Sequence, residues 1–127
     1  MRLALDTNAY RRFVDGDKGV LDQVQLAEQI ALPVPVLAEL RAGFAFGTRG
    51  LRNESVLSRF LDSPRVSILV CDEQTTLTYA QLYAQLRRQE TPIPINDIWI
   101  AALALQHRCA LLSFDADFDH LPQLARA

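Results

Sequence analysis

Five acidic residues stand at positions from which they could act together: Asp6, Glu39, Asp97, Asp115 and Asp117. Carboxylates that are brought close together repel one another, so such a cluster is tolerated only where a cation or protons neutralise it. No Cys or His stands at ligand spacing near these acids, and donor sets made of oxygen favour Mg²⁺, with Mn²⁺ possible, over zinc. Waters on such an ion have a lowered pKa and can attack a phosphodiester. The acids therefore predict metal-dependent phosphoryl hydrolysis.

Short apolar runs predict the strands that must position these acids. The runs cover residues 2–6, 30–34, 66–70 and 109–113. Between them, apolar residues at helical spacing predict a helix over 19–29 and further helices opened by Pro35, Asn53, Asp72 and Asn96. Residues 44–52 are expected to form a connection, and Thr7 and Asn8 a turn or cap. Strands that alternate with helices predict an α/β fold in three layers, with a mostly parallel sheet flanked by helices.

The acids fall at equivalent ends of these elements. Asp6 ends the first strand, Glu39 lies in an early helical turn, and Asp97 lies in the first turn of a helix. Asp115 and Asp117 follow the last strand. In a parallel α/β sheet the strand ends and the starts of the following helices lie along one edge, where ligands bind. We therefore expect the acids to converge.

Each acid also has an ordinary structural explanation. Asp6 can begin a turn, Asp97 can stabilise a helix N-terminus, and residues 115–119 can be a solvated loop. For Asp97, however, Asn96 already supplies a cap, so a second acid beside it suggests another purpose. Glu39 is flanked by apolar neighbours that would turn it towards the core.

Other classes of protein remain open at this point. A ribonuclease based on His107 and His120 would need no metal, although surface roles suit both histidines better. A phosphatase of the haloacid-dehalogenase kind also begins with a strand-ending Asp, but Asn8 occupies the place of its second Asp. A catalytically silent RNA-binding or protein-binding module is a third alternative.

Length and composition indicate the number of domains and the location of the protein. The chain has 127 residues, 50% of them hydrophobic, which suits a single domain over residues 1–127. No apolar run approaches the roughly 20 residues needed to span a bilayer, and Asp6 interrupts the region where a signal peptide would be apolar. We therefore expect a cytoplasmic protein that is not associated with a membrane. Cys71 and Cys109 stand among apolar neighbours, which predicts two buried, reduced thiols.

The net charge of the chain gives little support for nonspecific binding of nucleic acid. The net charge is -2, which gives no overall field to hold a polyanion. The basic residues are arginines apart from Lys18, and the planar guanidinium suits bidentate contact with phosphate. Arg11, Arg12 and Arg41 are the candidates for positioning a substrate phosphate.

Four blocks of the sequence resemble one known family. They are Asp6-Thr7-Asn8 after an apolar strand, and the segments 35–43, 93–102 and 111–118. In this order they resemble the PIN-domain nucleases, and within that family the VapC-type toxins of prokaryotic toxin-antitoxin pairs. The resemblance spans essentially the whole chain.

The resemblance implies an endoribonuclease that holds one or two divalent ions with Asp6, Glu39, Asp97 and Asp115. Asp6, Asp97 and Asp115 would bind the principal ion, and Glu39 would contact it directly or through water. The products would carry 5′-phosphate and 3′-hydroxyl ends. The same resemblance implies an RNA substrate, a homodimer, and a cognate antitoxin whose C-terminal segment enters the acidic groove. A PIN-fold nuclease that processes RNA outside a toxin system is the alternative.

Four further residues receive supporting roles. Asn8 and Ser113 match polar positions that usually support the metal site or the substrate, and Asn96 is assigned the same role. Asp115 ranks before Asp117 as the fourth acid, because it stands two residues beyond Ser113. Either residue could serve as the fourth acid; Asp117 would otherwise orient a metal-bound water, support a ligand or have no catalytic role.

Overall fold

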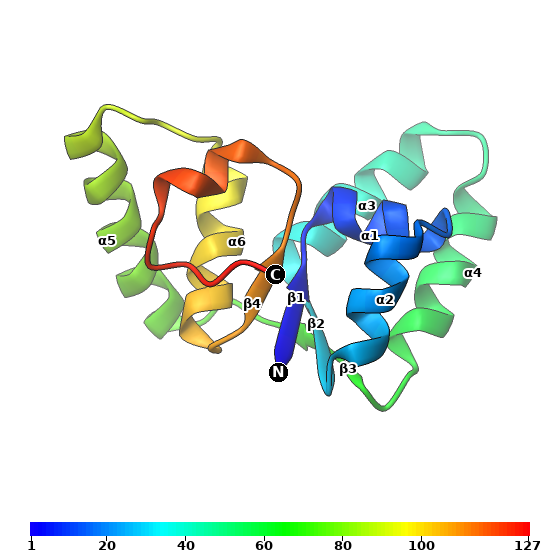
Figure 1. Ribbon diagram of the computed structural model, residues 1–127. Coiled ribbons are helices and arrows are strands. Elements are labelled where there is room, and N and C mark those ends of the chain that lie inside the picture. Colours follow the sequence, from blue (N-terminus) through cyan, green and yellow to red (C-terminus); the bar gives the residue numbers. More distant parts are fainter.

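Four strands form the middle layer of the protein in this computed structural model, which describes residues 1–127 (Figure 1). They are β1 (Arg2–Leu5), β2 (Gln29–Pro33), β3 (Val66–Leu69) and β4 (Ala110–Leu112). Their order across the sheet is β3-β2-β1-β4, and all neighbours pair in parallel. Leu3 of β1 stands opposite Ile30 of β2 and Ala110 of β4. The four predicted strands are confirmed, and the sheet is parallel throughout.

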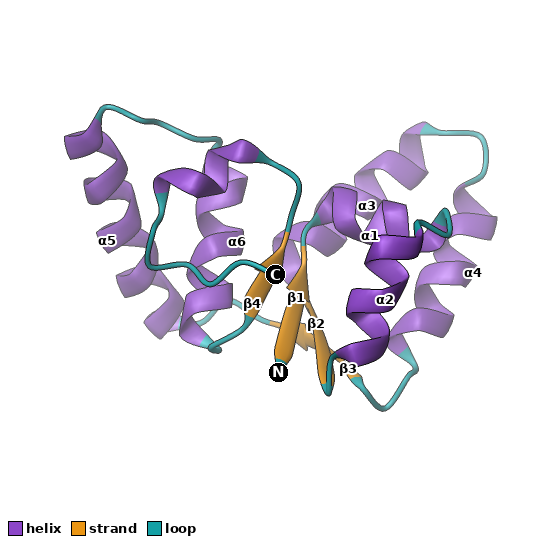
Figure 2. Cartoon of the chain, in the orientation of Figure 1, coloured by secondary structure: helices purple, strands orange, loops and turns teal.

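Six helices cover the two faces of this sheet (Figure 2). They are α1 (Thr7–Val14), α2 (Lys18–Leu26), α3 (Val34–Phe46), α4 (Gly50–Leu61), α5 (Glu73–Gln89) and α6 (Ile95–Gln106). Helices α1 to α4 lie on one side of the sheet, and α5 and α6 lie on the other. A short 3-10 helix, η1 (Ala116–His120), follows β4. The three-layer α/β arrangement expected from the sequence is confirmed.

Strand β1 is apolar after its first residue, Arg2, because both of its faces are covered. Leu3, Ala4 and Leu5 of β1 are fully buried, as is Leu32 of β2. A strand covered on one face only would alternate apolar and polar residues. The uninterrupted apolar runs in the sequence were therefore a sound indicator of a parallel sheet.

The order of the strands creates a crevice at one place on the sheet edge. The chain moves outward from β1 to β2 and β3, and then returns across the sheet to place β4 on the other side of β1. Crossovers in parallel sheets are right-handed, so the reversal puts α5 and α6 on the opposite face from the preceding helices. At such a reversal the segments that follow two adjacent strands diverge, and ligands bind between them. The segments that follow β1 and β4 begin with Asp6 and Ser113.

Aromatic pairs fix the helices of each outer layer against one another. Tyr10 and Phe13 of α1 both meet Phe60 of α4 edge to face, with ring centroids 5.3 Å apart in each pair. On the other face, Tyr79 of α5 stacks on Trp99 of α6 at 4.2 Å. Such pairs contribute about 0.5–1.5 kcal/mol beyond the burial of their area. They help to hold in place α1, which Asp6 caps, and α6, which carries Asp97.

Helix α1 differs from the sequence expectation of a turn at Thr7 and Asn8. Asp6 is the N-cap of this helix, because its Oδ1 accepts a hydrogen bond of 2.8 Å from the backbone N–H of Ala9. Thr7 and Asn8 are its first two residues. The segment has only two buried residues, Ala9 and Tyr10, so its apolar stripe is too short to reveal a helix by period alone.

The expected connection over residues 44–52 is largely helical. Helix α3 continues through Gly43 to Phe46, and α4 begins at Gly50 rather than at an Asn53 cap. Gly50 lies so close to α3 that an added Cβ would stand 2.7 Å from the carbonyl oxygen of Phe44. Gly50 thus permits close packing of the consecutive helices α3 and α4, where the sequence suggested a loop.

Two smaller expectations are also corrected. The N-cap of α6 is Pro94, and Asn96 lies inside the first turn with Asp97, so Asn96 does not cap the helix. Cys109 is buried as expected, but Cys71 is exposed. Asp72 does cap α5, in a capping box with Thr75, as predicted.

None of the helices combines the length and the apolar character that crossing a membrane requires.

Candidate active site

A cavity of about 440 Å³ opens at the carboxyl ends of β1 and β4, where the strand order reverses. Asp6, Glu39, Asp97 and Asp115 all line it, although they come from four separate parts of the chain. The convergence expected from the sequence is therefore observed. We call this cavity the acidic pocket; its lining residues are Asp6, Thr7, Asn8, Arg11, Glu39, Ala42, Pro94, Asn96, Asp97, Ile100 and Asp115.

Asp6 is the most buried acid of the pocket, with 6% of its surface exposed. Its two carboxylate oxygens have different partners. Oδ1 accepts from the backbone N–H of Ala9, and Oδ2 accepts a hydrogen bond from the hydroxyl of Ser113. Ser113 in turn accepts, at 3.1 Å, from the backbone N–H of Asp115. Ser113 thus connects the segments that follow β1 and β4 and fixes the orientation of Asp6.

Glu39 is held between two helices. Its Oε1 accepts a hydrogen bond of 3.0 Å from the hydroxyl of Thr7 on α1 and one of 2.8 Å from the amide of Asn96 on α6. The same Asn96 amide also reaches the carbonyl oxygen of Pro35 at 3.5 Å. Glu39 itself is exposed, not turned into the core as its apolar neighbours suggested. Two donors on one oxygen leave Oε2 available to the pocket.

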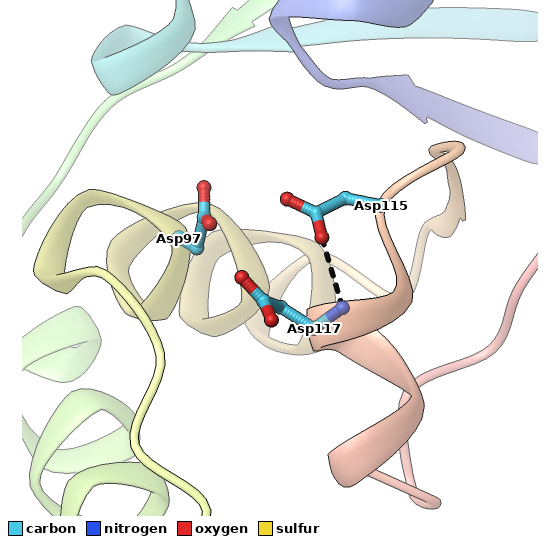
Figure 3. A group of neighbouring side chains, drawn as sticks. All are labelled: Asp97, Asp115 and Asp117. Carbon is cyan, nitrogen blue, oxygen red and sulfur yellow. Dashed lines mark hydrogen bonds between the residues drawn. The ribbon is translucent and has the colours of Figure 1, made fainter.

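Asp97, Asp115 and Asp117 form the tightest group of acids in the structure (Figure 3). One carboxylate oxygen from each lies within 4.8 Å of the others. Asp97 projects from α6, and the other two project from the segment at the start of η1, so that their side chains point towards one another. The backbone N–H of Asp117 donates to Oδ1 of Asp115 at 2.9 Å. Asp117, ranked second by sequence, therefore joins this group, although it does not line the acidic pocket.

The charges of this group act on Asp97 most strongly. Burial and the nearby carboxylates together raise the pKa of Asp97 to about 6; burial contributes most, followed by Asp115, Glu39, Asp117 and Asp6 in that order. Burial also raises the pKa of Asp6, against the opposing hydrogen bonds from Ser113 and Ala9. The protein thus pays a free-energy cost to keep these acids together, which a cation would relieve.

The donor set fits a hard divalent cation. The groups that face one another are carboxylates, without a His or Cys among them. In an octahedral Mg²⁺ site, neighbouring ligand oxygens stand about 3 Å apart and opposite ones about 4.2 Å apart. One carboxylate oxygen from each of Asp97, Asp115 and Asp117 lies within 4.8 Å of the others, so a contraction of up to about 2 Å between two of these oxygens brings them to a common ion. The residues present therefore fit a magnesium or manganese ion.

The raised pKa of Asp97 predicts how stability depends on pH in the absence of metal. The pKa of Asp97 is near 3.9 in the unfolded chain and about 6 in the folded protein. The folded state therefore binds this proton more tightly than the unfolded state does. Stability therefore increases as the pH falls from about 7.5 to about 5.5, by at most about 1 kcal/mol because solvent screens a half-buried group. Urea unfolding in EDTA at the two pH values measures this difference. In Asp97→Asn the difference should shrink; an unchanged difference would assign it to other groups.

The three candidate arginines are not equivalent in the structure. Arg11 lines the acidic pocket and forms no ion pair. Arg12 lies beside the pocket and is 3.8 Å from Asp17. Arg41 lies outside the pocket, and its guanidinium is engaged by both carboxylate oxygens of Glu54 at 2.9 and 3.2 Å. Arg11 is therefore the arginine that the structure brings to the acids.

The two histidines do not meet. His107 is the C-cap of α6, at the opposite end from Asp97, which is about 15 Å along a helix of this length. It is half-buried, so the expected surface position is wrong for His107, and its Nε2 has no hydrogen-bond partner. His120 is exposed at the end of η1. Neither lines the acidic pocket, which removes the support for a two-histidine mechanism.

Two residues of this site were missed by sequence reasoning. The sequence predicts only a turn or cap at Thr7, although this residue stands between the candidate site residues Asp6 and Asn8. Arg126 donates to the carbonyl oxygens of Ser113 at 3.0 Å and Asp115 at 3.4 Å, and so braces the segment between β4 and η1. No local pattern at the end of the chain indicates this contact.

Comparison with known proteins agrees with this geometry. A family model described as PIN domain matches residues 3–124. Ribonuclease VapC4 of Mycobacterium tuberculosis is 34% identical over 91 residues, which make up 72% of this chain and 70% of that protein.

Two solved structures show the same fold. A crystal structure of VapBC2 from Rickettsia felis, bound to a DNA fragment from their promoter, contains a chain that is 26% identical with a TM-score of 0.89; the match covers 100% of this chain and 98% of that one. VapBC-5 from Mycobacterium tuberculosis, a member of the VapBC family of toxin-antitoxin systems, gives 25% identity and a TM-score of 0.76 over 99% of this chain and 98% of that one. The protein therefore belongs to the PIN-domain family, as a relative of the VapC proteins.

Proposed function

We propose that the protein is a divalent-metal-dependent endoribonuclease and the toxin of a toxin-antitoxin pair. The observation that supports this most directly is the acidic pocket, in which Asp6, Glu39, Asp97 and Asp115 meet at the reversal point of the sheet. Its relatives point the same way, since one is named a ribonuclease and another belongs to a toxin-antitoxin system.

In this proposal Asp6, Asp97 and Asp115 hold the principal ion, with Glu39 contacting it directly or through water. Mg²⁺ is the expected metal, and Mn²⁺ is an alternative with the same oxygen donors. The bound ion would lower the pKa of the attacking water and stabilise the negative charge that develops on the phosphate and the departing 3′ oxygen.

The protein's own residues orient the reaction. Ser113 keeps Asp6 turned into the pocket, while Thr7 and Asn96 keep Glu39 between α1 and α6. Arg11 offers a guanidinium without an ion-pair partner at the same cavity, where it can contact a phosphate oxygen. Asp117 stands beside Asp97 and Asp115, and in this proposal it orients a water molecule.

The proposed partner is an antitoxin protein that enters the acidic pocket. A negatively charged cavity suits a segment that presents arginine, because the guanidinium pairs with carboxylates through two parallel hydrogen bonds. Binding of such a segment would replace the cation and block access of RNA. The homodimer expected from the resemblance stays a prediction.

Incubation of the purified protein with total RNA tests the function. We expect cleavage with Mg²⁺ or Mn²⁺, none with EDTA, and fragments with 5′-phosphate and 3′-hydroxyl ends. Asp6→Asn is the control for contaminating nucleases: its circular dichroism should match that of the parental protein, and its cleavage should be lost. Cleavage that persists in EDTA, or in Asp6→Asn at the parental rate, would contradict the proposal.

A further inference from the structure

An exposed aromatic side chain stands beside the acidic pocket. Phe114 lies between Ser113, which is buried, and Asp115, which lines the pocket, and 49% of its surface is exposed. A single exposed phenylalanine needs no explanation by itself. Phe114, however, directly precedes Asp115, a proposed metal ligand.

A second side chain lies over this ring. The guanidinium carbon of Arg12 is 3.8 Å from the centre of the Phe114 ring, the distance of a stacked cation–π contact. Arg12 projects from α1, and its other neighbour, Asp17, is 3.8 Å away, so its charge is only weakly paired. Its side chain is 49% exposed. Two flat groups from distant parts of the chain therefore lie against each other with much of their surface open to solvent.

The pair lines a cavity that adjoins the acidic pocket. This cavity has a volume of about 380 Å³. Three of its lining residues, Asn8, Arg11 and Asp115, also line the acidic pocket, so the two cavities have a common wall. Its size lies within the range of about 300–1,000 Å³ that is typical of pockets for small organic groups. A group held here would be next to whatever phosphate is held by the acids and Arg11.

We propose that Phe114 and Arg12 form a stacking platform for one unpaired nucleobase of the RNA, beside the phosphodiester that is cut. This deepens the proposed function and rests on it. Bases of single-stranded RNA stack on aromatic rings and on guanidinium planes, and the platform offers both. Asn8 and Asp15 line the same cavity and supply polar atoms that can meet the edge of a base.

The platform also predicts the form of the substrate. A base inside a helix is already stacked between its neighbours and cannot reach a protein side chain without being extruded. Cleavage should therefore occur in single-stranded segments or loops. Stacking alone tolerates all bases, so any preference at this nucleotide depends on polar contacts from residues such as Asn8.

A short single-stranded RNA with one mapped cleavage site tests the platform. Each nucleotide next to the cut is replaced in turn by an abasic one. We expect one of these replacements to lower kcat/KM of the parental protein about tenfold, within the range of about 5- to 150-fold supplied by one base–aromatic stack. On intact RNA, Phe114→Ala should lower kcat/KM by about the same factor. On the RNA with the sensitive nucleotide made abasic, Phe114→Ala and the parental protein should have the same kcat/KM. Equal losses on both RNAs would mean that Phe114 acts only through the fold, and would overturn the platform.

Three further variants separate stacking from general damage. Phe114→Leu keeps an apolar side chain without a flat ring and should lose activity as alanine does, whereas Phe114→Trp should retain it. Phe46→Ala is the matched control, because Phe46 is 95% exposed and lines neither cavity. Its activity should equal that of the parental protein.

A binding measurement gives a readout without catalysis. In the Asp97→Asn background with Mg²⁺, 2-aminopurine at the sensitive nucleotide should lose fluorescence on binding, since stacking quenches it, and Phe114→Ala should remove this quenching. If Phe114→Ala cleaves RNA at the parental rate, the platform is overturned but the proposed function stands. The same conclusion follows if this variant cleaves normally and only binds a protein partner more weakly. A parental protein that cleaves no RNA overturns the proposed function and the platform with it.

Discussion

Asp97→Asn is expected to lower RNA cleavage by at least about a hundredfold, the loss that follows removal of one group that stabilises charge in a transition state. Asparagine has nearly the same shape as aspartate but no charge, so it cannot help to neutralise a divalent cation. Asp97 interacts with all four other acids of the site, which makes its charge the one most closely linked to the cluster. The initial rate of cleavage of a fluorogenic RNA, with Mg²⁺ or Mn²⁺ in excess, measures the effect.

The matched control is Asp22→Asn, which removes one negative charge from the exposed surface of α2 and should leave the rate unchanged. Affinity for Mn²⁺ is the second readout, because loss of a direct ligand weakens metal binding as well as catalysis. The Asp97 variant should stay folded, since a neutral amide avoids both the burial of a charge and the repulsion from neighbouring acids, which together raise the pKa of this residue. If it cleaves RNA and binds Mn²⁺ as the parental protein does, Asp97 is not a ligand.

The sequence predicted the strands and the convergence of the acids because both depend on simple rules. Apolar runs identify buried parallel strands, and the edge at which such strands end is common to all of them. Asp6 and Asp115 could therefore be assigned to one site from their position after a strand. Glu39 and Asp97 required the additional expectation that helices begin at the same edge.

Interactions between distant side chains could not be predicted in this way. Asn96 has the residue type of a helix cap, yet in the structure its amide donates to Glu39, which lies 57 positions away. Arg41 has the type of a phosphate-binding residue, but Glu54 on the next helix occupies its guanidinium. In both cases the residue type allows several partners, and the packing of helices selects one.

The platform of Phe114 and Arg12 shows the same limit. Phe114 appeared in the sequence as one apolar residue within a block of the family resemblance, and Arg12 as one of three candidate arginines. Only the approach of α1 to the segment after β4 brings the ring and the guanidinium to 3.8 Å. A pattern along one segment contains no information about which residue of another segment will cover it.

The second large effect is expected from the two acids that follow β4. Asp115→Asn should lower cleavage by more than about a hundredfold, as loss of a direct metal ligand, and Asp117→Asn by about tenfold, near the lower end of the effect of residues that support ligands. Asparagine is an adequate cap, so Asp115→Asn keeps the hydrogen bond from the backbone N–H of Asp117 and removes only the charge. Rates and Mn²⁺ affinities of both variants, measured side by side, decide the order. A larger loss in Asp117→Asn would make Asp117 the fourth ligand.

Two observations favour Asp115. It lines the acidic pocket, whereas Asp117 does not, although both belong to the group within 4.8 Å. Among the carboxylates that raise the pKa of Asp97, Asp115 has the largest effect, and Asp117 acts less than Glu39. A cation that relieves the repulsion on Asp97 gains most by binding between Asp97 and Asp115. In the metal-free protein, Asp115→Asn should therefore also lower the pKa of Asp97 more than Asp117→Asn does, which NMR titration of the Asp97 carboxyl carbon measures independently of any RNA.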